Sequence, residues 1–155
     1  MALQSCNSLM RYLGVEIGIP ALALDEEHCC ALEIDSVVLN FEFDEPSGLL
    51  FLYANLGPVP AFGASLLYER LLAANLMGQS TEGATLGLDR EAQRLMLHRA
   101  LHAQQLADIE FKEAVEKFVD VAELWIRLIG QANDQRGSEG DVGAPASTPM
   151  PHLLA

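Results

Sequence analysis

The sequence has few positive charges: 9 lysines and arginines stand against 22 aspartates and glutamates in 155 residues, a formal net charge of −13. This excess repels nucleic acid phosphates and anionic membrane surfaces, so we expect neither as a partner. No apolar run approaches the roughly 20 residues that a membrane-spanning helix needs, so we expect no membrane insertion. Half of the residues are hydrophobic, which is enough for the core of one ordinary domain.

Cysteine is also scarce, with Cys6, Cys29 and Cys30 the whole set. No basic and apolar segment precedes Cys6, so the start of the chain is not typical of a lipoprotein or secretory signal. Without an export signal, we expect a cytoplasmic protein whose thiols are reduced. The odd count leaves one thiol unpaired in any arrangement.

The residue patterns of common catalytic sites are missing. A phosphate-binding loop needs a lysine beside closely spaced glycines, and the two lysines, Lys112 and Lys117, lie on the solvent face of a predicted helix. Ser65 has a glycine on one side only, so it does not form a nucleophile elbow. The sequence therefore predicts no enzymatic activity and no nucleotide cofactor.

Nitrogen and sulfur donors for a metal ion are present but poorly spaced. There is no Cys-x-x-Cys motif, and His98 and His102 are four residues apart in or near a predicted strand. Four residues of strand span about 13 Å, so these imidazoles diverge. His28 next to Cys29 and Cys30 follows three acids. We therefore predict ordinary solvent-facing side chains and no metal.

Hydrophobic periodicity predicts a helix at the N-terminus and then three strands. Apolar residues recur every three or four positions from Leu3 to Ile17, and Gly18 and Pro20 end the helix. The period changes to two in residues 28–34 and 37–44, as in half-buried antiparallel strands. The third strand, 49–56, is apolar on both faces, which is typical of the centre of a sheet.

A second helix is predicted at residues 61–77, and it is apolar on two sides. One side carries Phe62, Leu66, Ala73 and Met77, and the other carries Ala64, Leu67, Leu71 and Ala74. A helix of this kind must be covered on both sides, and a small domain has one sheet to offer. We expect another copy of the chain to supply the second cover, with the predicted dimer interface at Ala64, Leu67, Leu71 and Ala74.

Two more strands, at about 84–88 and 95–101, and a long amphipathic helix, at about 104–129, complete the predicted domain. The fold class is α+β: a twisted antiparallel sheet packed by helices in the order α-β-β-β-α-β-β-α. Residues 1–130 form this domain. Residues 131–155, rich in Gly, Pro and Ser, are predicted to be a disordered tail.

Two amphipathic helices cannot readily cover all the apolar surface of these strands, and leftover apolar surface on an acidic protein usually marks a binding site. We expect this surface on the outer side of the first helix, the segment that follows it, and outward positions of the first three strands. The predicted binding residues are Met10, Leu13, Leu22, Leu24, Val38, Leu50 and Leu52.

From Leu3 to Gly130 the element order resembles the class I type III secretion chaperones, typified by the chaperone of the translocated intimin receptor. The similarity rests on loose hydrophobic patterns in order: Gly14–Ile19, Ile34-Asp35, Leu66 through Ala74-Asn75-Leu76, Thr85–Asp89 and Leu95-Met96-Leu97. Small size and acidity are also similar to that family.

The resemblance implies a homodimer in the cytoplasm of a Gram-negative bacterium, with the second helix and late strands at the dimer interface. It implies a chaperone, without ATP, that binds the unfolded N-terminal segment of one or a few secreted effectors, which would enter apolar pockets and extend a sheet edge. A dimeric adaptor or regulatory protein that binds a folded partner accounts for the same residue patterns without the family resemblance.

Overall fold

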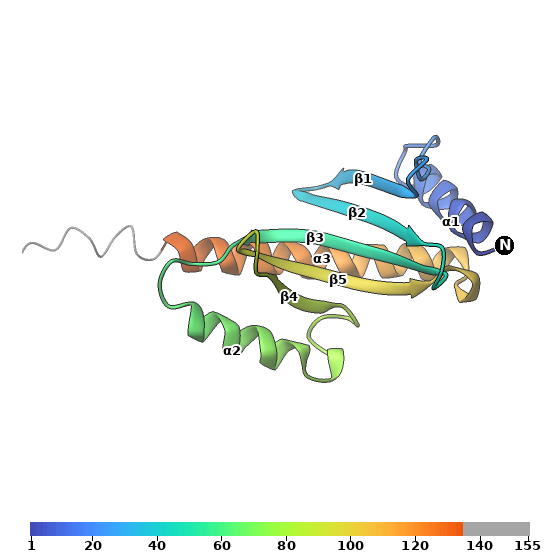
Figure 1. Cartoon of the computed structure of the whole chain (residues 1–155). Coiled ribbons are helices and arrows are strands. Elements are labelled where there is room, and N and C mark those ends of the chain that lie inside the picture. Colours follow the sequence, from blue (N-terminus) through green and yellow to red (C-terminus); the bar gives the residue numbers. More distant parts are fainter. Residues whose placement is uncertain (135–155) are drawn as a thin grey trace, which may run out of the picture.

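The computed structural model describes residues 1–134 (Figure 1). Three α-helices, five strands and two short 3-10 helices follow one another in this part of the chain. Their bounds are α1 Ala2–Glu16, β1 Cys29–Ile34, β2 Val37–Asp44, β3 Leu49–Pro58, α2 Ala64–Asn75, η1 Leu76–Gly78, β4 Thr85–Asp89, β5 Arg94–His102, η2 Ala103–Gln105 and α3 Asp108–Asp134.

All five strands form one antiparallel sheet in the order β1-β2-β3-β5-β4. The order of helices and strands and the α+β class are as predicted. β3 lies in the centre of the sheet, in agreement with its apolar character on both faces. β1 and β4 are the two edge strands.

α3 crosses one face of the sheet, called here the inner face, and contacts β3 and β2 (Figure 1). Every second side chain of β2 and β3 points to the inner face and is buried against α3. The buried residues include Leu39 and Phe41 on β2, Leu50 and Leu52 on β3, and Phe111 and Phe118 on α3. α1 packs on α3 and η2, and α2 lies beside β4. The hydrophobic effect at this single core holds the layers together.

Gly14 determines how the chain leaves α1. A Cβ atom at this position would lie 2.7 Å from the Leu22 Cβ and would also overlap the carbonyl of Ile19. The Ile19 N–H donates to the Gly14 carbonyl at 2.7 Å, so the segment after α1 folds back directly over the helix. Only a glycine permits this close approach, and it buries Leu22 against α1.

α3 continues past Gly130, where the sequence predicted its end, and reaches Asp134, the last described residue. A glycine inside a helix costs about 1 kcal/mol relative to alanine, which is less than the packing of Ile129 and its neighbours supplies. Asn133 also ties this last turn to β3, because its Nδ2 donates to the Pro58 carbonyl at 3.3 Å. The predicted disordered tail, residues 131–155, was wrong for residues 131–134, which belong to α3, and its remainder lies outside the described residues.

Within residues 1–134, no helix combines the length and the hydrophobicity that crossing a membrane requires.

Candidate functional site

The two edges of the sheet differ in how much of their backbone is already paired. At β4, the side chain of Asn75 behaves like a neighbouring strand. Its Nδ2 donates to the Leu86 carbonyl at 2.9 Å, and its Oδ1 accepts from the Leu86 N–H at 2.8 Å. α2 therefore covers the β4 edge at Leu86, the second residue of the strand.

The β1 edge is open at two residues. His28 accepts a backbone hydrogen bond from the opposite Phe43, so even-numbered residues of β1 point their backbone groups toward β2. The N–H and C=O groups of Cys29, Ala31 and Glu33 consequently point away from the sheet. A loop at Asp25 pairs with both backbone groups of Cys29. No described residue pairs with those of Ala31 and Glu33, so this edge has room for another strand.

A groove of about 250 Å³ lies between the end of α1, the β1–β2 turn and α3. Its apolar part consists of Leu13, Ile17, Ile34, Val115 and Val119. Leu13, Val115 and Val119 are buried, whereas Ile17 and Ile34 keep part of their surface exposed. Because Ile34 is also the last residue of β1, the groove and the open edge are continuous. A chain that paired with Ala31 and Glu33 would have this groove beside its inner-facing side chains.

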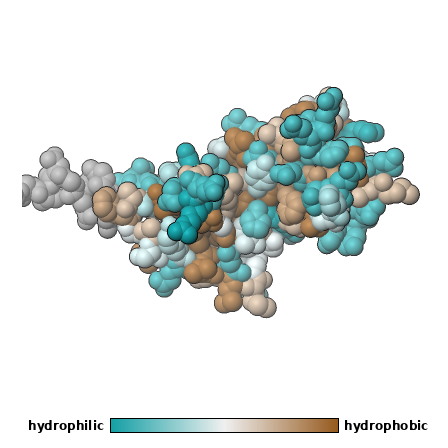
Figure 2. Space-filling model, viewed as in Figure 1, coloured by the Kyte–Doolittle hydropathy of each residue, from teal (hydrophilic) through white to brown (hydrophobic). Residues whose placement is uncertain are grey.

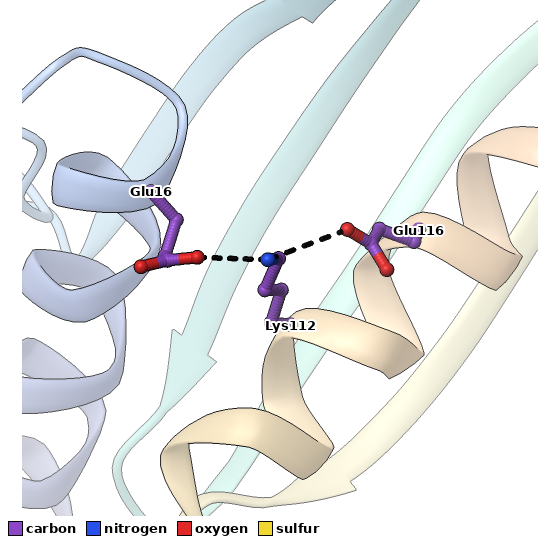
Figure 3. Close-up of polar contacts among 3 residues, drawn as sticks. All are labelled: Glu16, Lys112 and Glu116. Carbon is purple, nitrogen blue, oxygen red and sulfur yellow. Dashed lines mark hydrogen bonds and ion pairs between the residues drawn. The ribbon is translucent and has the colours of Figure 1, made fainter.

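Charged side chains surround the apolar part of the groove. Lys112 on α3 reaches across to α1, where its Nζ lies 2.7 Å from Glu16 Oε2, and it lies 3.9 Å from Glu116 Oε1 (Figure 3). The hydrogen bond and charge of Glu16 raise the pKa of Lys112 above its ordinary value, so the ammonium stays charged. Asp35 and Asp120 also line the groove.

α2 exposes one apolar side to solvent. Leu72 and Leu76 are each 72% exposed and Met77 is 84% exposed, and Leu88 on the adjacent β4 is 45% exposed. The surface of Leu72, Leu76, Met77 and Leu88 is called here the α2 face; Phe62 and Leu66, near the start of α2, are also exposed but line a separate hollow beside Leu128. Hydrophobic side chains project from the side of the molecule where α2 lies (Figure 2). An apolar surface of this extent on an acidic protein marks an interaction site.

Residues 8–126 match the model of the Tir chaperone protein (CesT) family. The chain belongs to this family. Its members are chaperones of type III secretion, and the family is not enzymatic. A Chlamydia pneumoniae protein, CPj0713/CpB0740, is 30% identical over 126 residues, which cover 80% of this chain and 95% of the relative.

Solved structures of complexes contain similar folds. A chain of the ExsC–ExsE complex has a TM-score of 0.69 and 25% identity and covers 82% of this chain and 95% of its own length. A chain of the HopA1–SchA chaperone–effector complex has a TM-score of 0.64 and 18% identity, with coverages of 83% and 95%. The structure of the Yersinia pestis type III secretion chaperone SycH, in complex with a stable fragment of YscM2, matches with a TM-score of 0.61 and 19% identity. This match covers 77% of this chain and 98% of the other.

In this CesT family member, the side of α2 that the sequence assigned to a dimer interface packs on its own chain. Leu67 and Leu71 are buried, and Ala64 and Ala74 are half-buried. The helix does have two apolar sides, as predicted, but their assignment was wrong. Leucines contribute to both sides, so hydropathy alone does not tell which side meets the sheet.

Most of the predicted binding residues belong to the core of this chaperone. Met10, Leu22, Leu50 and Leu52 are buried, and Leu24 is half-buried. The outward placement of Leu50 and Leu52 was wrong, because these two side chains face α3 and the alternate positions of β3 face outward. Leu13 is buried as well, yet it forms part of the groove.

Val38 is the predicted binding residue that stays exposed, at 55%. The pairing of β2 with β3 ends at Leu39 and Ala54, and the two strands then diverge (Figure 1). Val38 lines the resulting hollow of about 510 Å³ together with Asn55, Arg94 and Ile126. The structure therefore does not bring Val38 together with Leu13 at one groove.

The surroundings of the three cysteines disfavour the reactive thiolate form. Burial raises the pKa of Cys6 to about 12. Burial and the nearby carboxylates of Glu42 and Asp25 raise the pKa of Cys29, and burial followed by Asp25 raises that of Cys30. All three are free thiols. A raised pKa disfavours the thiolate, which is the reactive form.

The sequence reasoning missed the open edge at Ala31 and Glu33 and the groove residues Ile17, Ile34 and Asp35. Register, which decides where backbone groups point, is not visible in a single strand. The sequence did contain a weak signal for these residues. Ile17 ends the first predicted helix and Ile34 ends the first predicted strand, and each isoleucine is next to at least one acidic residue.

Proposed function

We propose that this protein is a cytoplasmic chaperone of a Gram-negative type III secretion system that holds the unfolded N-terminal segment of one or a few effectors. The observation that carries the proposal is the open β1 edge beside an apolar groove in a CesT family member. The structural similarity to chains of the ExsC–ExsE and HopA1–SchA complexes supports a protein partner.

The client segment adds a strand to β1. Its backbone pairs with the N–H and C=O groups of Ala31 and Glu33, and alternate side chains enter the groove near Ile17 and Ile34. Backbone pairing is independent of sequence, so it suits a client without a fixed fold. Apolar anchoring then offsets part of the entropy lost when a disordered segment becomes ordered. This holding function needs no ATP.

The protein acts as a homodimer through the α2 face. Leu72, Leu76 and Met77 are largely exposed in the single chain, and a second copy is the simplest cover for them. The family resemblance also implies an interface at the second helix and late strands. A dimer presents two β1 edges and two grooves, which lengthens the surface along which one client can be bound.

Affinity purification of the protein from its native host, followed by mass spectrometry, identifies the client. An N-terminal fragment of the captured protein is then expressed with the wild type and with the Ala31→Pro variant. Proline at Ala31 removes an N–H that points to solvent and leaves the ladder to β2 intact, so the variant folds. We expect the wild type to form a soluble complex with this fragment and the variant to bind it much more weakly.

A matched control is Ala21→Pro, in the exposed segment between α1 and β1, which leaves the edge unchanged. Capture of a folded regulator, with no binding of an unfolded N-terminal fragment, would favour the alternative of a dimeric adaptor. Equal client affinity of the wild type and Ala31→Pro would overturn the strand-addition mechanism.

A further inference from the structure

We infer that the groove between α1, β1 and α3 selects client segments in which lysine or arginine flanks the apolar anchor. The inference rests on the proposed function and adds a charge rule to it. The occupant is an extended, cationic and apolar peptide segment, as opposed to a purely apolar or an acidic one.

The charges around the groove are unbalanced. Four carboxylates, those of Glu16, Asp35, Glu116 and Asp120, and one ammonium, that of Lys112, lie in or beside the groove. Lys112 is already engaged by Glu16 at 2.7 Å and by Glu116 at 3.9 Å (Figure 3). In the described residues 1–134, no basic side chain pairs with Asp35 or Asp120.

Asp35 and Asp120 stand on opposite sides of the groove. Asp35 lies in the β1–β2 turn directly after Ile34, and Asp120 lies on α3 directly after Val119. An apolar client side chain that fills the space near Ile34 and Val119 therefore places the next side chains on the same face of its strand, two residues away on either side, close to both carboxylates. A neutral neighbour would displace water from these carboxylates without replacing its hydrogen bonds. A lysine or arginine would pair with them.

The rule is local and is separate from the general attraction of a protein with net charge −13 for cations. General attraction depends on the total charge, so neutralising any one acidic residue weakens it by the same amount. Pairing in the groove depends on Asp35 and Asp120 in particular. Two variants with equal net charge can therefore distinguish the two effects.

The test uses two fluorescent synthetic 12-residue peptides with leucine at two alternate central positions, a test residue at the next alternate position on either side, and serine elsewhere, so that leucines and test residues share one face of an extended strand. One peptide has lysine at the two test positions and the other has glutamine, and anisotropy measures their binding to the full-length protein. Two surface ion pairs are expected to make the lysine peptide bind about tenfold tighter at low salt. Salt should reduce this preference.

The double variant Asp35→Asn, Asp120→Asn should lose most of the preference, and its fold should persist because asparagine tolerates the positive φ of residue 35. The matched control is Glu45→Gln, Glu91→Gln, with the same change in net charge at exposed turns outside the groove. A preference that persists in the groove variant, or falls equally in the control, overturns the inference.

Equal binding of the two peptides to the wild type also overturns the inference. If Ala31→Pro still weakens both peptides in that case, the proposed strand addition stands without the charge rule. If neither peptide binds the wild type, the groove is not a peptide site, and both the inference and the strand-addition mechanism fail.

Discussion

Asn75 and Leu86 form a two-way hydrogen-bonded pair, with distances of 2.9 and 2.8 Å, that joins α2 to the free edge of β4. Asn75→Ala would leave both backbone groups of Leu86 unpaired at a partly buried position. The free energy of unfolding should fall by about 1–3 kcal/mol, measured by urea denaturation. Asn75→Asp keeps the acceptor for the Leu86 N–H but sets a carboxylate oxygen against the Leu86 carbonyl, so it should be destabilised as well. Unchanged stability in Asn75→Ala would show that the pair does not contribute.

Glutamate substitutions at two adjacent leucines of α2 should have different effects on folding and dimer formation. Leu72 is 72% exposed and Leu71 is 7% exposed. Leu72→Glu should yield a folded monomer, because it introduces a charge into the proposed dimer interface. Leu71→Glu should unfold the protein, because it buries an unpaired carboxylate. Light scattering gives the mass and circular dichroism the fold; a wild type that is monomeric at micromolar concentration would contradict the proposed dimer.

The reassignment of β3 is tested by Leu52→Ala. Leu52 is fully buried under α3, so its truncation should cost about 2–5 kcal/mol of unfolding free energy. The control is Val38→Ala on β2, at an exposed position, where the change should stay within about 0.5 kcal/mol. Thermal and urea denaturation measure both. Comparable losses in the two variants would mean that Val38 is also a core residue.

Two glycines on different helices should respond in opposite directions to alanine. Gly14→Ala places a methyl group against Leu22 and the backbone of Ile19, so it should destabilise the protein or detach the segment after α1. Gly130→Ala has no heavy atom within 4 Å of the added Cβ and should stabilise α3 by about 0.5–1 kcal/mol. Melting temperatures measure both changes. A stabilised Gly14→Ala variant would contradict the close approach.

The thiols predict a pH dependence of alkylation by iodoacetamide. Burial and nearby carboxylates raise the pKa of Cys29 above its ordinary value, so its thiolate fraction at neutral pH is below that of an ordinary thiol. The rate at Cys29 should therefore rise with pH to a midpoint above that of an ordinary cysteine thiol. Cys6, with a pKa of about 12, should react only when the protein unfolds. Mass spectrometry locates the label, and a midpoint at Cys29 below that of an ordinary cysteine thiol, such as free glutathione, would contradict this electrostatic account.

The fold was predictable because its periodicities are long and unambiguous. Alternation in residues 37–44 and the apolar stripe of α3 specify a strand and a helix that bury one side each. The orientation of β3 and α2 was more difficult to predict because both elements are apolar on two sides. For this reason Leu52 was assigned to the client-binding surface and Leu71 to the dimer interface.

The site was less predictable than the fold, since it depends on pairing and distance. The free backbone of Ala31 follows from the register with β2, and the bond between Lys112 and Glu16 joins residues 96 positions apart. Neither relationship leaves a pattern in one sequence. The family resemblance gave the function class because it draws on the order of all the elements together.

Amide hydrogen exchange at Ala31 and Glu33, with and without the captured N-terminal client fragment, tests the central claim most directly. The account predicts rapid exchange of both amides in the free protein, because their N–H groups point to solvent. Strand addition should slow both at least tenfold in the complex, while the Leu32 amide, already paired with β2, changes little. Unchanged exchange at Ala31 and Glu33 in a saturated complex would contradict binding at the β1 edge.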